Sequence, residues 1–131
     1  MPRATGHHGP VTSHLVEVVN GKAVYDGRPL AAWVPDVVRR IAERCSPVDV
    51  ILFGSVARGD DGADSDIDLL VVLPKMNRRH DAAVAVLREL RDFPVPVDVT
   101  VADPATMERD RHLPGVIRVA LREGTHVLAA A

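Results

Sequence analysis

The chain has 131 residues, of which 47% are hydrophobic, so it has room for one domain with one modest core. Its net charge of −2 gives no general attraction for nucleic acid, which makes nucleic acid an unfavoured partner. The single cysteine, Cys45, excludes an intramolecular disulfide and a zinc site built on cysteines. No apolar run is long enough for a signal peptide or a membrane span, so we expect a cytoplasmic protein without membrane contact.

The first 29 residues divide into two parts. Residues 1–13 carry proline, glycine and small polar residues without periodicity, which predicts a flexible tail ahead of a single domain at 14–131. The pair Asn20-Gly21 lies between two β-prone runs and is a preferred type I′ turn sequence, although a helix broken at Asn20 is the alternative. We therefore expect a β-hairpin extension over 14–29, with a second turn at Asp26-Gly27.

The rest of the chain alternates between helical and strand patterns. Apolar residues recur at helical spacing in three stretches, and short apolar runs between them predict buried strands. Asp103-Pro104 is a typical helix start, with aspartate as the N-cap. The expected helices cover Val34–Cys45, Arg78–Phe93 and Pro114–Glu123, and the expected strands cover Val48–Phe53, Asp66–Leu73, Val97–Val101 and Thr125–Leu128. This order predicts an α/β (α+β) fold with helices packed on one small sheet.

Two carboxylates lead directly into one of these strands. Asp66 and Asp68 are two residues apart, so they project from the same strand face, about 6.6 Å apart along the chain. Ionised carboxylates on one partly buried face repel each other unless one is protonated, both reach solvent, or a cation lies between them. Their oxygen ligands suit Mg²⁺ or Mn²⁺. Taken alone, this pair fits a solvated strand end better than a metal site.

A third carboxylate changes that balance. Asp98 lies inside the apolar run Val97–Val101, where an aspartate needs a partner or a function. If this strand lies beside the strand that follows Asp66, three carboxylates meet on one sheet face. Such a set can hold two divalent ions about 3.5–4 Å apart, as in-line displacement at phosphorus requires.

The turn Gly54-Ser55 follows directly after the first predicted central strand. Glycine lets the backbone approach a ligand closely, and the serine hydroxyl and the amides of a following short helix can bind phosphate oxygens. Arg58 offers forked donors in the same direction. Taken alone, this segment fits an ordinary strand-to-helix turn better than a phosphate-binding site.

Together these features resemble a known family. Gly54-Ser55, ten residues, and then Asp66-Ile67-Asp68 are similar to the signature of the DNA polymerase β-type nucleotidyltransferase superfamily. The longer string FGSVARGDDGADSDIDLLVVL resembles its minimal members, the MNT-type domains that pair with HEPN-domain toxins. The resemblance implies a palm-like mixed sheet. It also implies that two Mg²⁺ ions, with Mn²⁺ as the substitute, are held by Asp66, Asp68 and Asp98, and that the nucleotide is bound by Gly54, Ser55, Arg58 and Ser65.

The resemblance also implies a reaction. Asp98 would act as general base while AMP is transferred from ATP to a hydroxyl and pyrophosphate leaves. In the toxin–antitoxin relatives the acceptor is a tyrosine of the HEPN toxin, so we expect such a toxin as partner and an antitoxin role. A small-molecule acceptor, as in enzymes that modify aminoglycosides, and neutralisation by binding alone are the alternatives. Oligomerisation and the role of the N-terminal hairpin stay open.

Overall fold

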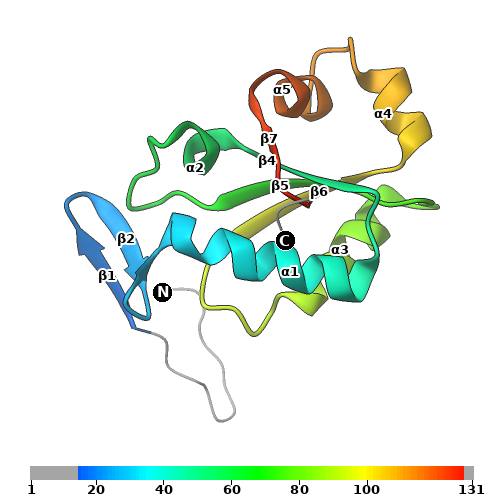
Figure 1. Ribbon diagram of the computed structural model, residues 1–131. Helices are drawn as coiled ribbons and strands as arrows, with labels where there is room; N and C mark the ends of the chain where they lie inside the picture. Colours follow the sequence, from blue (N-terminus) through cyan, green and yellow to red (C-terminus); the bar gives the residue numbers. More distant parts are fainter. Residues whose placement is uncertain (1–14, 129–131) are drawn as a thin grey trace.

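The structure is a computed structural model that describes residues 15–128. The tail predicted at 1–13 lies outside the described residues. Figure 1 shows a central sheet with α1 and α3 on one face and α2, α4 and α5 on the other, while a small hairpin sheet lies at one end. Within the described part of the chain, no helix is long and apolar enough to cross a membrane.

The order of elements follows the predicted alternation. The strands are β1 (Val16–Val19), β2 (Lys22–Tyr25), β3 (Arg28–Pro29), β4 (Asp49–Phe53), β5 (Ile67–Val72), β6 (Val97–Ala102) and β7 (Thr125–His126). A 3₁₀ turn at Leu30–Trp33 precedes the helices α1 (Val34–Cys45), α2 (Gly54–Arg58), α3 (Arg79–Glu89), α4 (Pro104–Asp110) and α5 (Val116–Glu123).

The main sheet is mixed, with the strand order β6-β5-β4-β7. β5 and β6 run parallel, whereas β4 is antiparallel to both of its neighbours. The register of the parallel pair places Asp68 directly opposite Asp98. The strand that carries Asp98 therefore lies beside the strand that follows Asp66, which is the arrangement needed for three carboxylates to meet.

The sheet separates two apolar layers, because alternate strand residues point to opposite faces. Residues such as Leu69 and Val101 pack with Val38 and Ile41 of α1, in the larger layer. The smaller layer, under α4 and α5, contains Ile51, Leu70, Ala102, Ile117 and Ala120. Asp68 lies two residues before Leu70, so it projects from the face that α4 and α5 cover only in part.

The N-terminal segment forms the predicted hairpin and not the broken helix. Asn20 and Gly21 both have positive φ (53° and 79°), as a type I′ turn requires. A second turn at Asp26-Gly27 leads into β3, so that β1, β2 and β3 form an antiparallel sheet. β1 is exposed along its whole length, whereas Ala23 and Tyr25 of β2 are buried in the core.

Most predicted boundaries differ from the structure by one or two residues, and the start of β5 and the end of α3 have a clear physical reason. Asp66 lies just outside the strand, because the parallel ladder begins where the amide of Ile67 donates to the carbonyl of Pro96. The helix predicted to reach Phe93 ends at Glu89, and two tight turns closed by Leu90 N–H to Leu87 O and Phe93 N–H to Leu90 O follow it. Neither change moves the acidic residues away from the sheet face.

Candidate functional site

Three carboxylates meet at one end of the parallel strand pair. Asp66 immediately precedes β5, Asp68 is the second residue of β5, and Asp98 is the second residue of β6. One oxygen from each lies within 4.8 Å of the others. Asp66 and Asp68 are partly buried, while Asp98 is exposed at the edge strand. An all-carboxylate donor set of this size fits a hard divalent cation.

The charges in this cluster disfavour one another. Burial, followed by the neighbouring charges of Asp66 and Asp98, raises the pKa of Asp68 from 3.8 to about 6. The positive charge of Arg58 has a smaller effect in the opposite direction. A divalent cation between the carboxylates would remove both penalties, because it supplies the missing opposite charge. The raised pKa of Asp68 and the all-carboxylate donor set therefore both favour a divalent cation at this place.

Gly54 gives the cluster room at the carbonyl end of β4. Its φ is +79°, and a Cβ atom built at this position would collide with the carboxylate of Asp68. A glycine is needed here for two reasons, a left-handed backbone and the close approach of the Asp68 carboxylate. The sequence alone suggested only that this glycine admits a ligand, and the contact with Asp68 could not be foreseen.

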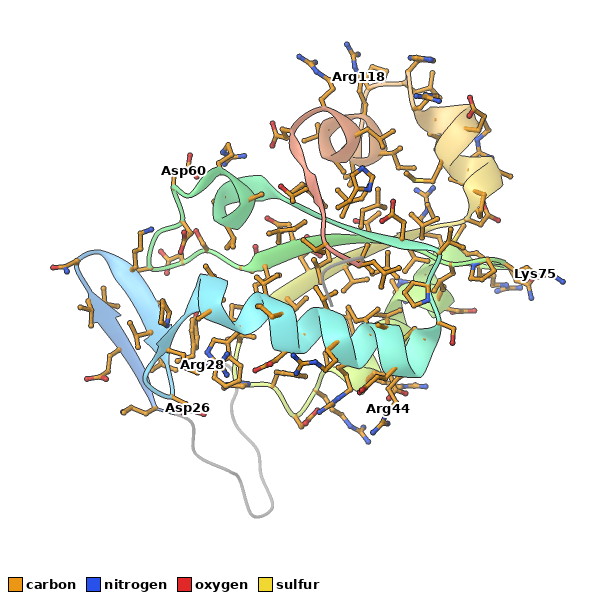
Figure 2. The ribbon with its side chains drawn as sticks, viewed as in Figure 1. Asp26, Arg28, Arg44, Asp60, Lys75 and Arg118 are labelled. Carbon is orange, nitrogen blue, oxygen red and sulfur yellow. The ribbon has the colours of Figure 1, made fainter. Side chains whose placement is uncertain are left out.

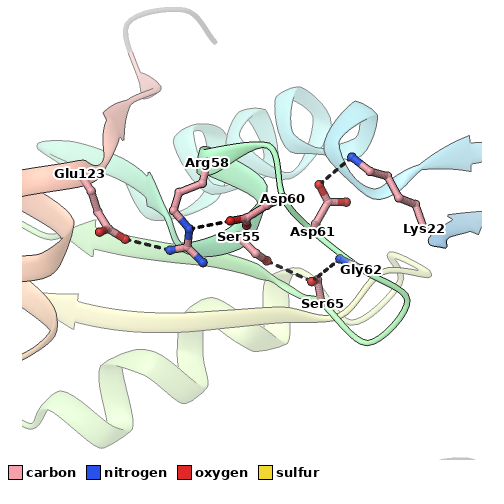
Figure 3. Close-up of polar contacts among 8 residues, drawn as sticks. All are labelled: Lys22, Ser55, Arg58, Asp60, Asp61, Gly62, Ser65 and Glu123. Atoms are coloured by element: carbon pink, nitrogen blue, oxygen red, sulfur yellow. Dashed lines mark hydrogen bonds and ion pairs between the residues drawn. The ribbon is translucent and has the colours of Figure 1, made fainter. Parts of the chain in front are cut away.

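Ser55, in α2, and Ser65, at the end of the loop between α2 and β5, are hydrogen-bonded to each other. The Ser55 hydroxyl donates to Ser65 Oγ at 3.0 Å, and the backbone amide of Gly62 donates to the same Oγ at 2.8 Å. Figure 3 shows this chain of contacts. The two serines predicted to bind nucleotide are thus neighbours, and Ser65 directly precedes Asp66, the first aspartate of the acidic cluster.

Arg58 occupies the last position of α2 and forms two ion pairs. Its Nε contacts Asp60 at 3.2 Å, and one of its terminal nitrogens contacts Glu123 at the end of α5 at 3.0 Å (Figure 3). The side chain remains about half exposed. It joins two helices on the site face, and its predicted contact with phosphate stays a prediction.

Asp61 has a role that the sequence did not reveal. In the sequence it looks like an ordinary loop acid, but its side chain is only 6% exposed and pairs with Lys22 at 3.4 Å. Five aspartates between 60 and 68 look alike in the sequence, and nothing local distinguishes the buried one. Its partner is 39 residues away, at the tip of the hairpin.

Comparison with known proteins agrees with this geometry. The family model described as "Nucleotidyltransferase domain" matches residues 34–125. The chain is also similar to a solved structure, a candidate nucleotidyltransferase of Sulfolobus solfataricus, with 29% identity and a TM-score of 0.52. That match covers 74% of this chain and 78% of the other. No curated protein matches the sequence.

The family match begins at α1 and ends in β7, so it contains every element of the main sheet and leaves out the hairpin. The acidic cluster and the Gly54-Ser55 turn both lie inside it. The chain therefore belongs to the nucleotidyltransferase domain family, and it is a nucleotidyltransferase with an acidic cluster suited to a divalent metal.

Proposed function

We propose that this protein transfers AMP from ATP to a hydroxyl group, with Asp66, Asp68 and Asp98 as the metal ligands. The observation that carries the proposal is the approach of these three carboxylates to within 4.8 Å, inside a nucleotidyltransferase domain. Two Mg²⁺ ions bound there would neutralise charge on the α-phosphate and on the leaving pyrophosphate. Mn²⁺ would satisfy the same oxygen ligands.

The residues of the chain would supply positioning and proton transfer. Gly54, Ser55 and Ser65 would hold the β- and γ-phosphates through backbone amides and hydroxyls, with Arg58 adding positive charge. Asp98 would accept the proton of the attacking hydroxyl, because it is the exposed member of the cluster and lies on the edge strand. The α-phosphorus–oxygen bond to pyrophosphate then breaks as the new phosphoester bond forms.

For the acceptor, we propose a tyrosine hydroxyl of a HEPN-type toxin, which makes the protein an antitoxin. The support is the resemblance of residues 50–73 to the minimal domains of such pairs, together with the exposure of Asp98. In and just before α5, Leu113, Val116 and Val119 expose between 42% and 53% of their surface, which would give a partner protein an apolar contact area.

One feature favours a small-molecule acceptor as the second candidate. A hollow of about 210 Å³ is lined by Thr100, by the Arg79–Asp110 ion pair and by the residues that lead into α5. Thr100 lies two residues beyond Asp98 on the same face of β6, about 6.6 Å along the strand. A small alcohol bound in this hollow would lie next to the proposed general base.

The test is transfer of radiolabelled AMP from ATP, with Mg²⁺, to the protein encoded beside this gene. We expect a labelled partner, and a loss of about 100-fold or more in the variants Asp66→Asn and Asp98→Asn. Asp64→Asn is the matched control, because Asp64 is an exposed acid of the same loop and should leave the rate unchanged.

Three outcomes separate the candidates. Labelling of small alcohols without any protein acceptor, reduced by Val116→Trp in the hollow, would favour the second candidate. Two results together would show that the protein acts by binding alone: no nucleotidyl transfer to either kind of acceptor, and intact toxin neutralisation by a variant that lacks all three carboxylates. Labelling that persists in Asp66→Asn and Asp98→Asn would contradict the assignment of the metal ligands.

A further inference from the structure

We infer that the N-terminal hairpin is a positioning element for the nucleotide-binding loop, and that the Lys22–Asp61 ion pair is its point of action. The inference rests on the proposed function for its consequence on nucleotide binding. Its structural part, that Lys22 holds the loop between α2 and β5 in place, does not depend on that function. The family match leaves the hairpin out, so the family gives it no role.

The contact joins the hairpin tip to the middle of the loop. Lys22 Nζ lies 3.4 Å from Asp61 Oδ1, and Figure 3 shows the lysine side chain extending from the hairpin to this carboxylate. The two partners are unequal: the Lys22 side chain is 46% exposed and that of Asp61 only 6%. Without Lys22, Asp61 would be a buried carboxylate without its cation, which a protein avoids by opening the segment to water.

The loop contacts continue from Asp61 to the proposed phosphate site. The next residue, Gly62, donates its amide to Ser65 Oγ, which also accepts the hydroxyl of Ser55. Gly62 also lies close to the hairpin turn, since a Cβ atom added there would be 4.0 Å from the carbonyl oxygen of Gly21. The hairpin thus pairs with the loop through a charge, and its turn lies close to the loop backbone. Movement of Asp61 would therefore disturb the Ser55–Ser65 pair.

The hairpin itself is firmly attached to the body of the protein. Ala23 and Tyr25 are buried in the main core, and Trp33 Nε1 donates to the carbonyl of Tyr25 at 3.1 Å. Arg28 pairs with Asp36 of α1 at 2.9 Å. Because its base is fixed, the hairpin can hold its tip residue Lys22 at a constant place above the loop.

The test measures amide hydrogen exchange over residues 60–65 in the full chain, together with ATP affinity in the presence of Mg²⁺. In Lys22→Met we expect exchange of these amides to accelerate by about tenfold or more, while the amides of β5 keep their protection. ATP affinity should fall by a similar factor. Lys22→Arg should restore both. Lys75→Met is the matched control, because Lys75 projects from a loop at the opposite end of the molecule (Figure 2).

The double variant Lys22→Met/Asp61→Asn removes the buried charge together with its partner. Its loop exchange should be slower than in Lys22→Met alone, since two coupled residues are not additive. Exchange over 60–65 within about twofold of the wild type in Lys22→Met would overturn the inference. Accelerated exchange with unchanged ATP affinity would also overturn it, because the loop would then not control the nucleotide site. Failure of the wild type to bind ATP would instead refute the proposed function, and the exchange result alone would then decide the structural part.

Discussion

Replacing Asp68 by asparagine should stabilise the metal-free protein while it abolishes metal binding. The carboxylate of Asp68 is partly buried and lies within 4.8 Å of two others. Its pKa is raised to about 6, first by burial and then by the charges of Asp66 and Asp98. At neutral pH the folded state therefore carries a charge that the unfolded state accommodates more easily. Asparagine keeps nearly the same shape without that charge.

The size of the effect follows from the pKa. The difference between 3.8 and about 6 corresponds to about 3 kcal/mol, and solvent screening of a partly exposed group reduces this to about 1–2 kcal/mol. The sign follows from proton binding: between these two pKa values the folded state binds more protons than the unfolded state. The stabilising contribution of protonated Asp68 is therefore complete below about pH 4 and is lost as the pH rises through about 6.

Urea unfolding with a chelator, at pH 7.5 and at pH 3.5, measures this difference. At pH 7.5, Asp68→Asn should have the larger free energy of unfolding, and at pH 3.5 the two proteins should be equal. Added Mg²⁺ should stabilise the wild type and leave the variant unchanged, since only a bound ligand shifts the folding equilibrium. A variant less stable than the wild type at pH 7.5 without metal would refute the reasoning. Asp64→Asn should change neither quantity.

Three further predictions concern neighbouring residues. Gly54→Ala should lower the free energy of unfolding by at least about 2 kcal/mol in urea titrations, because alanine is strained at a φ of +79° and its Cβ would meet Asp68; a smaller loss would contradict the close approach. The Mg²⁺ affinity measured by calorimetry should fall about tenfold from pH 7 to pH 5, because the ion must displace the proton of Asp68, whose pKa is about 6; a constant affinity would contradict this. Asp103→Ala should cost about 1 kcal/mol without changing metal affinity, because it removes the cap at which Asp103 accepts from the Thr106 amide at 2.8 Å.

The sheet and its helices could be predicted because their patterns are local. The apolar runs around Leu52 and Leu70 are short, rich in β-branched residues and bounded by turn residues, which favours buried strands. The Asn20-Gly21 pair predicted the hairpin turn correctly, since only a few residue types accept positive φ at both positions. The family resemblance of residues 54–68 led to the nucleotidyltransferase fold that the comparisons support.

The contacts between distant segments could not be predicted. The burial of Asp61 depends on Lys22, and no pattern within either segment indicates the other. The collision that excludes a side chain at Gly54 depends on the register of β4 and β5, which pairs Phe53 with Asp68. The end of α3 was predicted four residues too late, because residues 90–93 continue the apolar spacing of the helix but form tight turns. Pattern indicates which residues are buried, whereas pairing across the fold decides what they contact.

The most direct test of the central claim is the number of divalent ions bound per chain. Mn²⁺ titration followed by electron paramagnetic resonance, with a non-hydrolysable ATP analogue present, reports this number. We expect two ions in the wild type, one held mainly through Asp98, and a loss of at least one ion in Asp98→Asn. Wild-type protein that binds no ion under these conditions, or an Asp98→Asn variant that binds two, would contradict the three-carboxylate metal site.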